Sequence, residues 1–234
     1  MRSPLKPSDL HHLRAAEGWL ELGSPAEARS ELAHISAERL DHPDVLEVSW
    51  MLFAREKNWN ACVKTAELLV QQAPERPGGW IHRSFALHEL HRTEEAYSKL
   101  NSVRRVFSDQ WIIPYNLACY LTQLDRIKEA ARELHAAMKI DAGAVKTAAS
   151  TDPDLEPLRK CLDEMREYPC AQRPLKLSPG RNPIHNLLHF PLGDHGPIGR
   201  HGSAGTRGNG QHQRSRSWIS WLIRRGKGPR GGWK

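Results

Sequence analysis

Residues 19–28 read WLELGSPAEA: a large apolar residue, a Gly-Ser-Pro break and then a small residue. Adding 34 to Ala28 gives Cys62, Ala96 and Ala130, which are all small. Three further rows keep apolar residues at the same stride: Trp19, Phe53, Leu87 and Leu121; Leu32, Ala66, Leu100 and Leu134; and Ile35, Leu69, Val103 and Ala137. A fixed period of this length predicts a solenoid, in which stacked copies of one unit share a continuous core.

The register divides the chain into an N-terminal extension, 1–8, and four repeats, 9–42, 43–76, 77–110 and 111–144. Within a repeat the apolar spacing is helical, as in Leu13, Ala16 and Leu20. Each repeat is therefore predicted to be a helical hairpin. The predicted turns are the polar breaks Gly23-Ser24-Pro25, Lys57-Asn58, His91-Arg92 and Asp125-Arg126, and Pro25 suits the first turn of a helix.

Over 9–144 the chain resembles the tetratricopeptide-repeat (TPR) family. The resemblance implies an all-α, right-handed superhelix of about four helix-turn-helix repeats. The sequence departs from the family pattern by placing Cys62 at a small position and by lacking a proline at the end of the fourth repeat. The matching elements are Trp19-Leu20-Glu21-Leu22-Gly23 with Ala28; Trp59 with Cys62 and Pro74; Trp80 with Leu87, Ala96 and Leu100; and Asn116-Leu117-Ala118-Cys119-Tyr120 with Ala130 and Leu134.

After the repeats, 145–168 is predicted to cap the array. Residues 151–159 read TDPDLEPLR and resemble the terminal segment of bacterial TPR proteins. A helix is expected at about 154–167, with Asp152 or Asp154 as its N-cap. The end repeat has a neighbour on one side only, so a cap with a polar outer face keeps it soluble.

Composition indicates a cytoplasmic protein. The four cysteines show no paired spacing, and Cys62 and Cys119 fall on predicted helices, so buried free thiols and a reducing compartment are expected. The first residues contain no apolar run typical of a secretion signal. No stretch approaches the length of a membrane span.

Composition changes at residue 169. Residues 169–234 hold twelve Arg or Lys and one acidic residue, Asp194, with Pro and Gly throughout, which predicts a disordered basic tail. Arginines interleaved with Trp218, Trp221 and Trp233 would suit nucleic acid or an anionic membrane surface. The alternatives are a passive solvated tail and an extension translated past a frameshift or a lost stop codon.

The resemblance also implies that the first helix of each repeat lines a concave groove. Phe85 and Tyr115 would then be exposed aromatic anchors for a peptide. The predicted function is a non-catalytic scaffold or adaptor that binds a protein or peptide partner in this groove; its oligomeric state is left open. The groove residues are Arg14, Glu17, Glu47, Met51, Arg55, His82, Phe85, His88, Tyr115 and Asn116, with Glu21, Glu89, Cys119 and Gln123 beside them.

Several site classes are not predicted. A carboxylate clamp would need Lys, Asn, Asn, Lys and Arg at positions that hold Leu13, Glu17, Val48, Gly78 and His82. His88-Glu89-Leu90-His91 is not the His-Glu-x-x-His arrangement of a metal-binding helix, and His185 and His189 lie between prolines. No phosphate-binding loop or nucleophile elbow occurs, so neither an enzyme nor a cofactor is predicted.

Overall fold

The computed structural model describes residues 4–160, and every regular element among them is helical. The tail predicted for 169–234 and the cysteines Cys161 and Cys170 lie outside this range. Four helical hairpins are followed by a shorter terminal part. The elements are α1 (Pro7–Glu21), α2 (Pro25–Ala33), η1 (Ala37–Arg39), α3 (Pro43–Arg55), α4 (Trp59–Gln72), α5 (Pro77–Glu89), α6 (Thr93–Asn101), α7 (Ile112–Gln123), α8 (Ile127–Ile140), α9 (Ala142–Ala149) and η2 (Pro153–Leu155).

The 34-residue period recurs in the backbone of the turns. Gly23, Lys57, His91 and Asp125 each have a φ between 57° and 82°, in the left-handed region. In each turn the next residue donates its N–H to a carbonyl five residues earlier, as from Ser24 to Trp19 at 2.9 Å. These bonds close the helix end in the manner of a Schellman motif. The polar breaks in the sequence are therefore the hairpin turns, as predicted.

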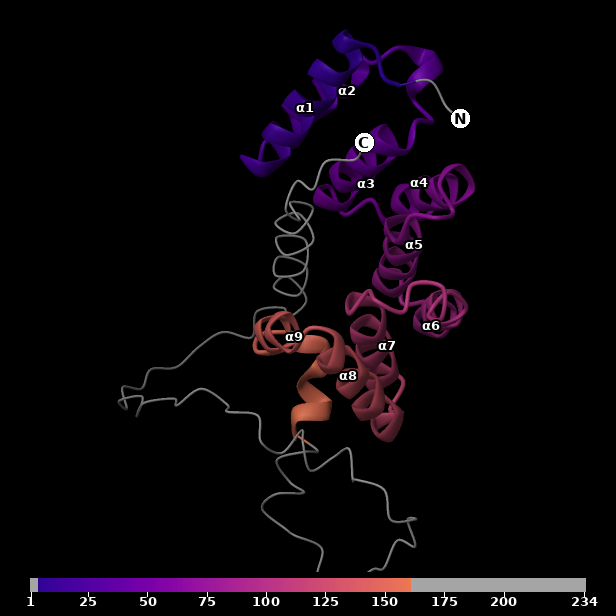
Figure 1. Ribbon diagram of the computed structural model, residues 1–234. Helices are drawn as coiled ribbons and strands as arrows, with labels where there is room; N and C mark the ends of the chain where they lie inside the picture. Colours follow the sequence, from indigo (N-terminus) through magenta and orange to yellow (C-terminus); the bar gives the residue numbers. More distant parts are fainter. Residues whose placement is uncertain (1–3, 161–234) are drawn as a thin grey trace, which may run out of the picture.

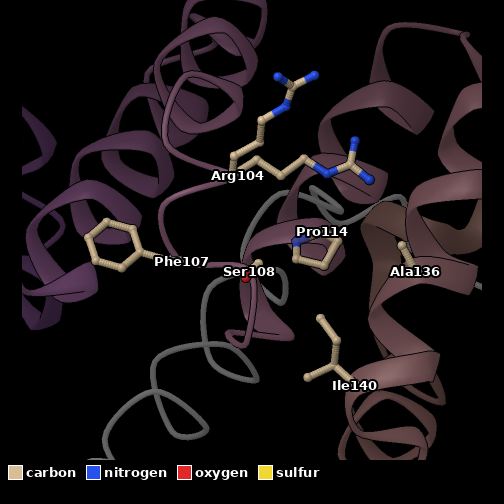
Figure 2. Close-up of a pocket in the computed structure, with 7 residues that line it drawn as sticks. Arg104, Phe107, Ser108, Pro114, Ala136 and Ile140 are labelled. Carbon is tan, nitrogen blue, oxygen red and sulfur yellow. The ribbon is translucent and has the colours of Figure 1, made fainter.

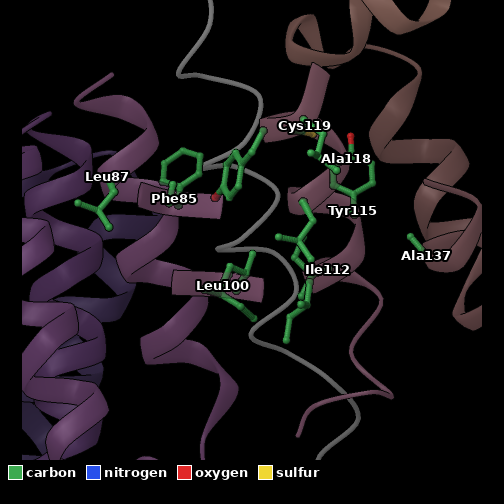
Figure 3. Close-up of a cluster of buried hydrophobic side chains, with 14 of the residues drawn as sticks. Phe85, Leu87, Leu100, Ile112, Tyr115, Ala118, Cys119 and Ala137 are labelled. Atoms are coloured by element: carbon green, nitrogen blue, oxygen red, sulfur yellow. The ribbon is translucent and has the colours of Figure 1, made fainter. Parts of the chain in front are cut away.

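The small residues of the stride allow the helices to approach closely. Ala28, Cys62, Ala96 and Ala130 are all fully buried. The helix pairs follow one another along the array, from α1 and α2 at one end to α8 and α9 at the other (Figure 1). Because each pair packs against the next, the α5 to α8 part shares one core, in which Leu100 is also fully buried (Figure 3).

Both cysteines in the described range are free and buried, as predicted. Burial raises the pKa of the Cys62 thiol to about 12, and it raises that of Cys119 as well. The thiolate is the reactive form of cysteine, so neither group is poised as a nucleophile.

The large apolar row is not buried throughout: Phe53 is partly buried, and Trp19 differs most from the prediction. Trp19 is 37% exposed, whereas Leu87 and Leu121 are 1% exposed. The inner repeats have a neighbour on both sides, but α1 and α2 lie at the end of the array (Figure 1). Trp19 therefore lacks the second layer of side chains that covers the equivalent leucines.

The terminal part contains one helix more than the sequence predicted. Asp141 accepts a hydrogen bond from the Ala144 N–H at 2.8 Å and so caps α9. A second helix follows η2 from residue 156 to the limit of the described range. Asp152 accepts from the Asp154 N–H at 3.0 Å, so it is the cap at this turn, as predicted. None of the helices in 4–160 is long and apolar enough to cross a bilayer.

Candidate partner-binding surface

The predicted groove residues become more buried along the array. On α1, Arg14 and Glu17 are exposed, and on α3 Glu47, Met51 and Arg55 are partly buried. On α5, His82 and His88 are partly buried and Phe85 is buried, while Tyr115 and Asn116 on α7 are buried completely. Predicted groove residues are therefore accessible on the first helices of the first three repeats, whereas on the fourth Gln123 alone among them is exposed.

Phe85 is a core residue rather than an exposed anchor. Only 4% of it is accessible, and its ring meets the edges of Trp50 and Trp59 at centroid distances of 6.2 and 5.8 Å. The two tryptophans come from α3 and α4, so both helices of the second repeat close over this side chain. Figure 3 shows Phe85 inside the cluster of buried side chains. The expectation that it faces a partner is wrong.

Tyr115 is likewise buried, because the chain itself covers α7. The Tyr115 hydroxyl donates to Asp152 Oδ2 at 2.7 Å, and the Cys119 thiol lies 3.7 Å from the same oxygen. Burial, together with the nearby carboxylate, raises the pKa of Tyr115 far above its ordinary value. Asn116 is 1% exposed, and within 4–160 its amide has no hydrogen-bond partner.

The covering element is Asp152–Leu155, called here the terminal segment. Besides its bonds to Tyr115 and Cys119, it contacts two further predicted groove residues. His88 Nε2 lies 3.3 Å from Asp154 Oδ2, and Gln123 donates to the Asp154 carbonyl at 2.9 Å. The predicted residues of α5 and α7 do converge, but they converge on the chain's own terminal segment.

The open part of the surface is continuous between neighbouring first helices. Glu47 of α3 lies beside Gly78 of α5, since a Cβ added to Gly78 would stand 3.5 Å from Glu47 Oε1. Burial raises the pKa of Glu47, and the carboxylates of Asp44 and Glu17 act in the same direction. We call this surface the first-helix face; it comprises Arg14, Glu17, Glu47, Met51, Arg55 and His82.

Two solved repeat proteins share this architecture over most of their length. The chain is similar to TTC0263, a thermophilic TPR protein of Thermus thermophilus, with a TM-score of 0.55 and 17% identity over 70% of this chain and 93% of that one. The fold is a TPR solenoid. MamA (41-end) from Desulfovibrio magneticus RS-1 is similar with the same TM-score and 12% identity, covering 70% and 94% of the two chains. No family model and no curated protein matches the sequence.

The burial of His82 predicts that the stability of this TPR array depends on pH. Its ring stacks on Trp50 at a centroid distance of 4.1 Å, its Nδ1 is buried without a partner in 4–160, and burial lowers its pKa to about 4. Because the folded pKa lies below the unfolded value of about 6.5, its stabilising contribution is present above pH 6.5 and is lost as the pH falls towards 4.

We expect this group to remove about 2 kcal/mol from the free energy of unfolding between pH 7 and pH 5. Urea unfolding of wild type and of His82→Phe at the two pH values measures this loss of stability. The variant keeps an aromatic ring on Trp50 but has no group that titrates in this range. The variant should lose about 2 kcal/mol less than wild type over this range. Equal losses would show that the imidazole is solvated.

A separate pocket lies between the α6–α7 connection and α8 (Figure 2). Its volume is about 350 Å³. Arg104, one of its lining residues, is paired with Glu133 of α8 at 2.7 Å. Within 4–160, no lining residue is a histidine, a cysteine or a carboxylate. The lining residues in this range are Arg104, Arg105, Phe107, Ser108, Pro114, Ala136 and Ile140.

Proposed function

We propose that the chain is a non-catalytic scaffold that binds a protein or peptide partner on the first-helix face. The TPR fold supports the general role, since stacked repeats present extended surfaces that such proteins use for binding. The observation that carries the proposal is the partly buried charge on this face. Arg55 is partly buried and its Nε has no partner in 4–160, while Glu47 is held beside the exposed Glu17.

The first-helix face holds Arg14 and Arg55 as well as Glu17 and Glu47, so it has no net charge, and only the part around the two glutamates favours Lys or Arg in a partner. Glu17 and Glu47 stand on neighbouring helices, and the Glu17 carboxylate is one of the charges that raise the pKa of Glu47, after burial. Arg76 is the basic group that acts on Glu47, and its guanidinium is 3.9 Å away while it binds Asp44 at 2.6 Å. A cationic side chain from a partner would remove this repulsion. Met51 beside them offers an adaptable apolar contact.

Selection of a peptide-display library on the full chain tests the proposal. We expect the selected peptides to be enriched in Lys and Arg. They should bind the double variant Glu17→Lys/Glu47→Lys at least about tenfold more weakly than wild type, because two attractive charge pairs become repulsive. The matched control is Glu27→Lys/Glu67→Lys, which reverses the same charge at exposed sites on the second helices of the same two repeats. The control should bind like wild type.

Equal loss in both double variants would mean that only net charge matters, and no loss in either would remove the first-helix face as the site. Deleting 169–234 adds a third arm. Nucleic-acid or anionic-vesicle binding that disappears with this deletion, and not with the glutamate changes, would support the alternative function predicted for the tail.

A further inference from the structure

A group of three potential metal ligands lies across the first hairpin. His12 belongs to α1, Glu31 to α2, and His34 is the C-cap residue of α2. One ligand atom from each of the three lies within 4.8 Å of the others. Within the described residues no other set of three such side chains meets this condition.

His34 is oriented as a metal ligand usually is. Its Nδ1 lies 2.8 Å from the Ser30 carbonyl oxygen. A carbonyl can only accept, so Nδ1 carries a proton, and in the neutral ring the lone pair is on Nε2. A hydrogen bond from the second ring nitrogen to a backbone carbonyl is the arrangement that fixes the tautomer and ring direction of ligating histidines.

His12 and Glu31 supply the other two donors. His12 Nδ1 lies 2.8 Å from Glu31 Oε2, so the two side chains meet between α1 and α2. The rings of His12 and His34 stack at a centroid distance of 5.0 Å with 18° between their planes, which places the two imidazoles side by side.

The geometry points to a binding site for a first-row divalent transition metal, with Zn²⁺ as the principal candidate, formed by His12, Glu31 and His34. Two imidazoles and one carboxylate suit Zn²⁺, Cu²⁺ or Ni²⁺, whereas Mg²⁺ and Ca²⁺ prefer all-oxygen sites. The side chains of His12 and Glu31 are 29% and 28% exposed, so an ion can reach them from solvent. Three protein ligands leave a coordination position for water.

Binding would join α1 to α2 across the turn at Gly23. A ligand that binds only the folded state stabilises it, so the first repeat should resist unfolding when the metal is present. At a free Zn²⁺ concentration about one hundred times the Kd, we expect the melting temperature to rise by about 5 to 10 °C.

The test uses the full chain and Zn²⁺ alone as the probe. Isothermal titration calorimetry is run on wild type, His12→Ala, Glu31→Gln and His34→Ala, with His135→Ala on α8 as the control. We expect each of the three site variants to lose at least about tenfold in affinity for one Zn²⁺, while the control keeps it. The chain holds 13 histidines, so the difference between variants, and not the total bound, is the measurement.

Two further measurements separate loss of the site from unfolding of a variant. Far-ultraviolet circular dichroism must show wild-type helicity in each variant, and Glu31→Gln preserves side-chain shape if an alanine variant unfolds. The ring ¹⁵N resonances of His12 and His34 should shift on adding Zn²⁺. Identical titrations for wild type and all site variants, or unmoved resonances, would overturn the site.

Discussion

Asp152→Ala is expected to lower the free energy of unfolding by about 3 kcal/mol. The change leaves the buried Tyr115 hydroxyl without its acceptor, which costs roughly 1–3 kcal/mol, and removes the cap of η2, which costs about 1 kcal/mol more. Urea unfolding of the full chain, followed by circular dichroism, measures the loss.

Asp109→Ala is the control, because Asp109 is exposed in the α6–α7 connection. It should change stability by less than about 0.5 kcal/mol. A double-mutant cycle with Tyr115→Phe isolates the pair, and we expect a coupling energy of about 1–2 kcal/mol. Additive losses would show that Tyr115 and Asp152 do not depend on each other.

Ala96→Phe should destabilise the array by about 3 kcal/mol, because Ala96 is fully buried on α6 and the core has no space for a ring. For a protein of this size such a loss corresponds to a fall in melting temperature of about 10 °C. Thermal unfolding of the full chain measures it.

The matched change is Ala26→Phe, at an exposed position of α2. It adds the same side chain to a helix surface and should leave the melting temperature within about 2 °C of wild type. If Ala96→Phe has the same melting temperature as this control, the small residues of the 34-residue period do not set the distance between helices.

The repeating features of the fold could be predicted from the sequence because they are local. A turn depends on a few adjacent residues, and Lys57, His91 and Asp125 stand in the left-handed conformation at the breaks the sequence marked. Close packing at Ala28 and Ala96 follows from the stride, since equivalent residues of stacked repeats meet equivalent surroundings.

The candidate surface could be predicted only in part, because a register tells which way a side chain points but not what covers it. Tyr115 points from α7 as expected, yet Asp152, 37 residues later, lies over it and belongs to no repeat. Phe85 is covered by Trp50 and Trp59, whose combined position depends on how α3 and α4 cross α5. The 34-residue period of the sequence contains no pattern that predicts either of these covering contacts.

The terminal segment also limits the length of the peptide that the proposed first-helix face could hold. It covers Tyr115 of α7, so the face consists of residues on α1, α3 and α5. Helices in contact lie about 8–10 Å apart, and three of them therefore span roughly 30 Å including their side chains. An extended strand advances about 3.3 Å per residue, so about nine residues of a partner would fill the face. In the proposed complex, the remaining residues of a longer peptide would extend beyond α1, away from the terminal segment.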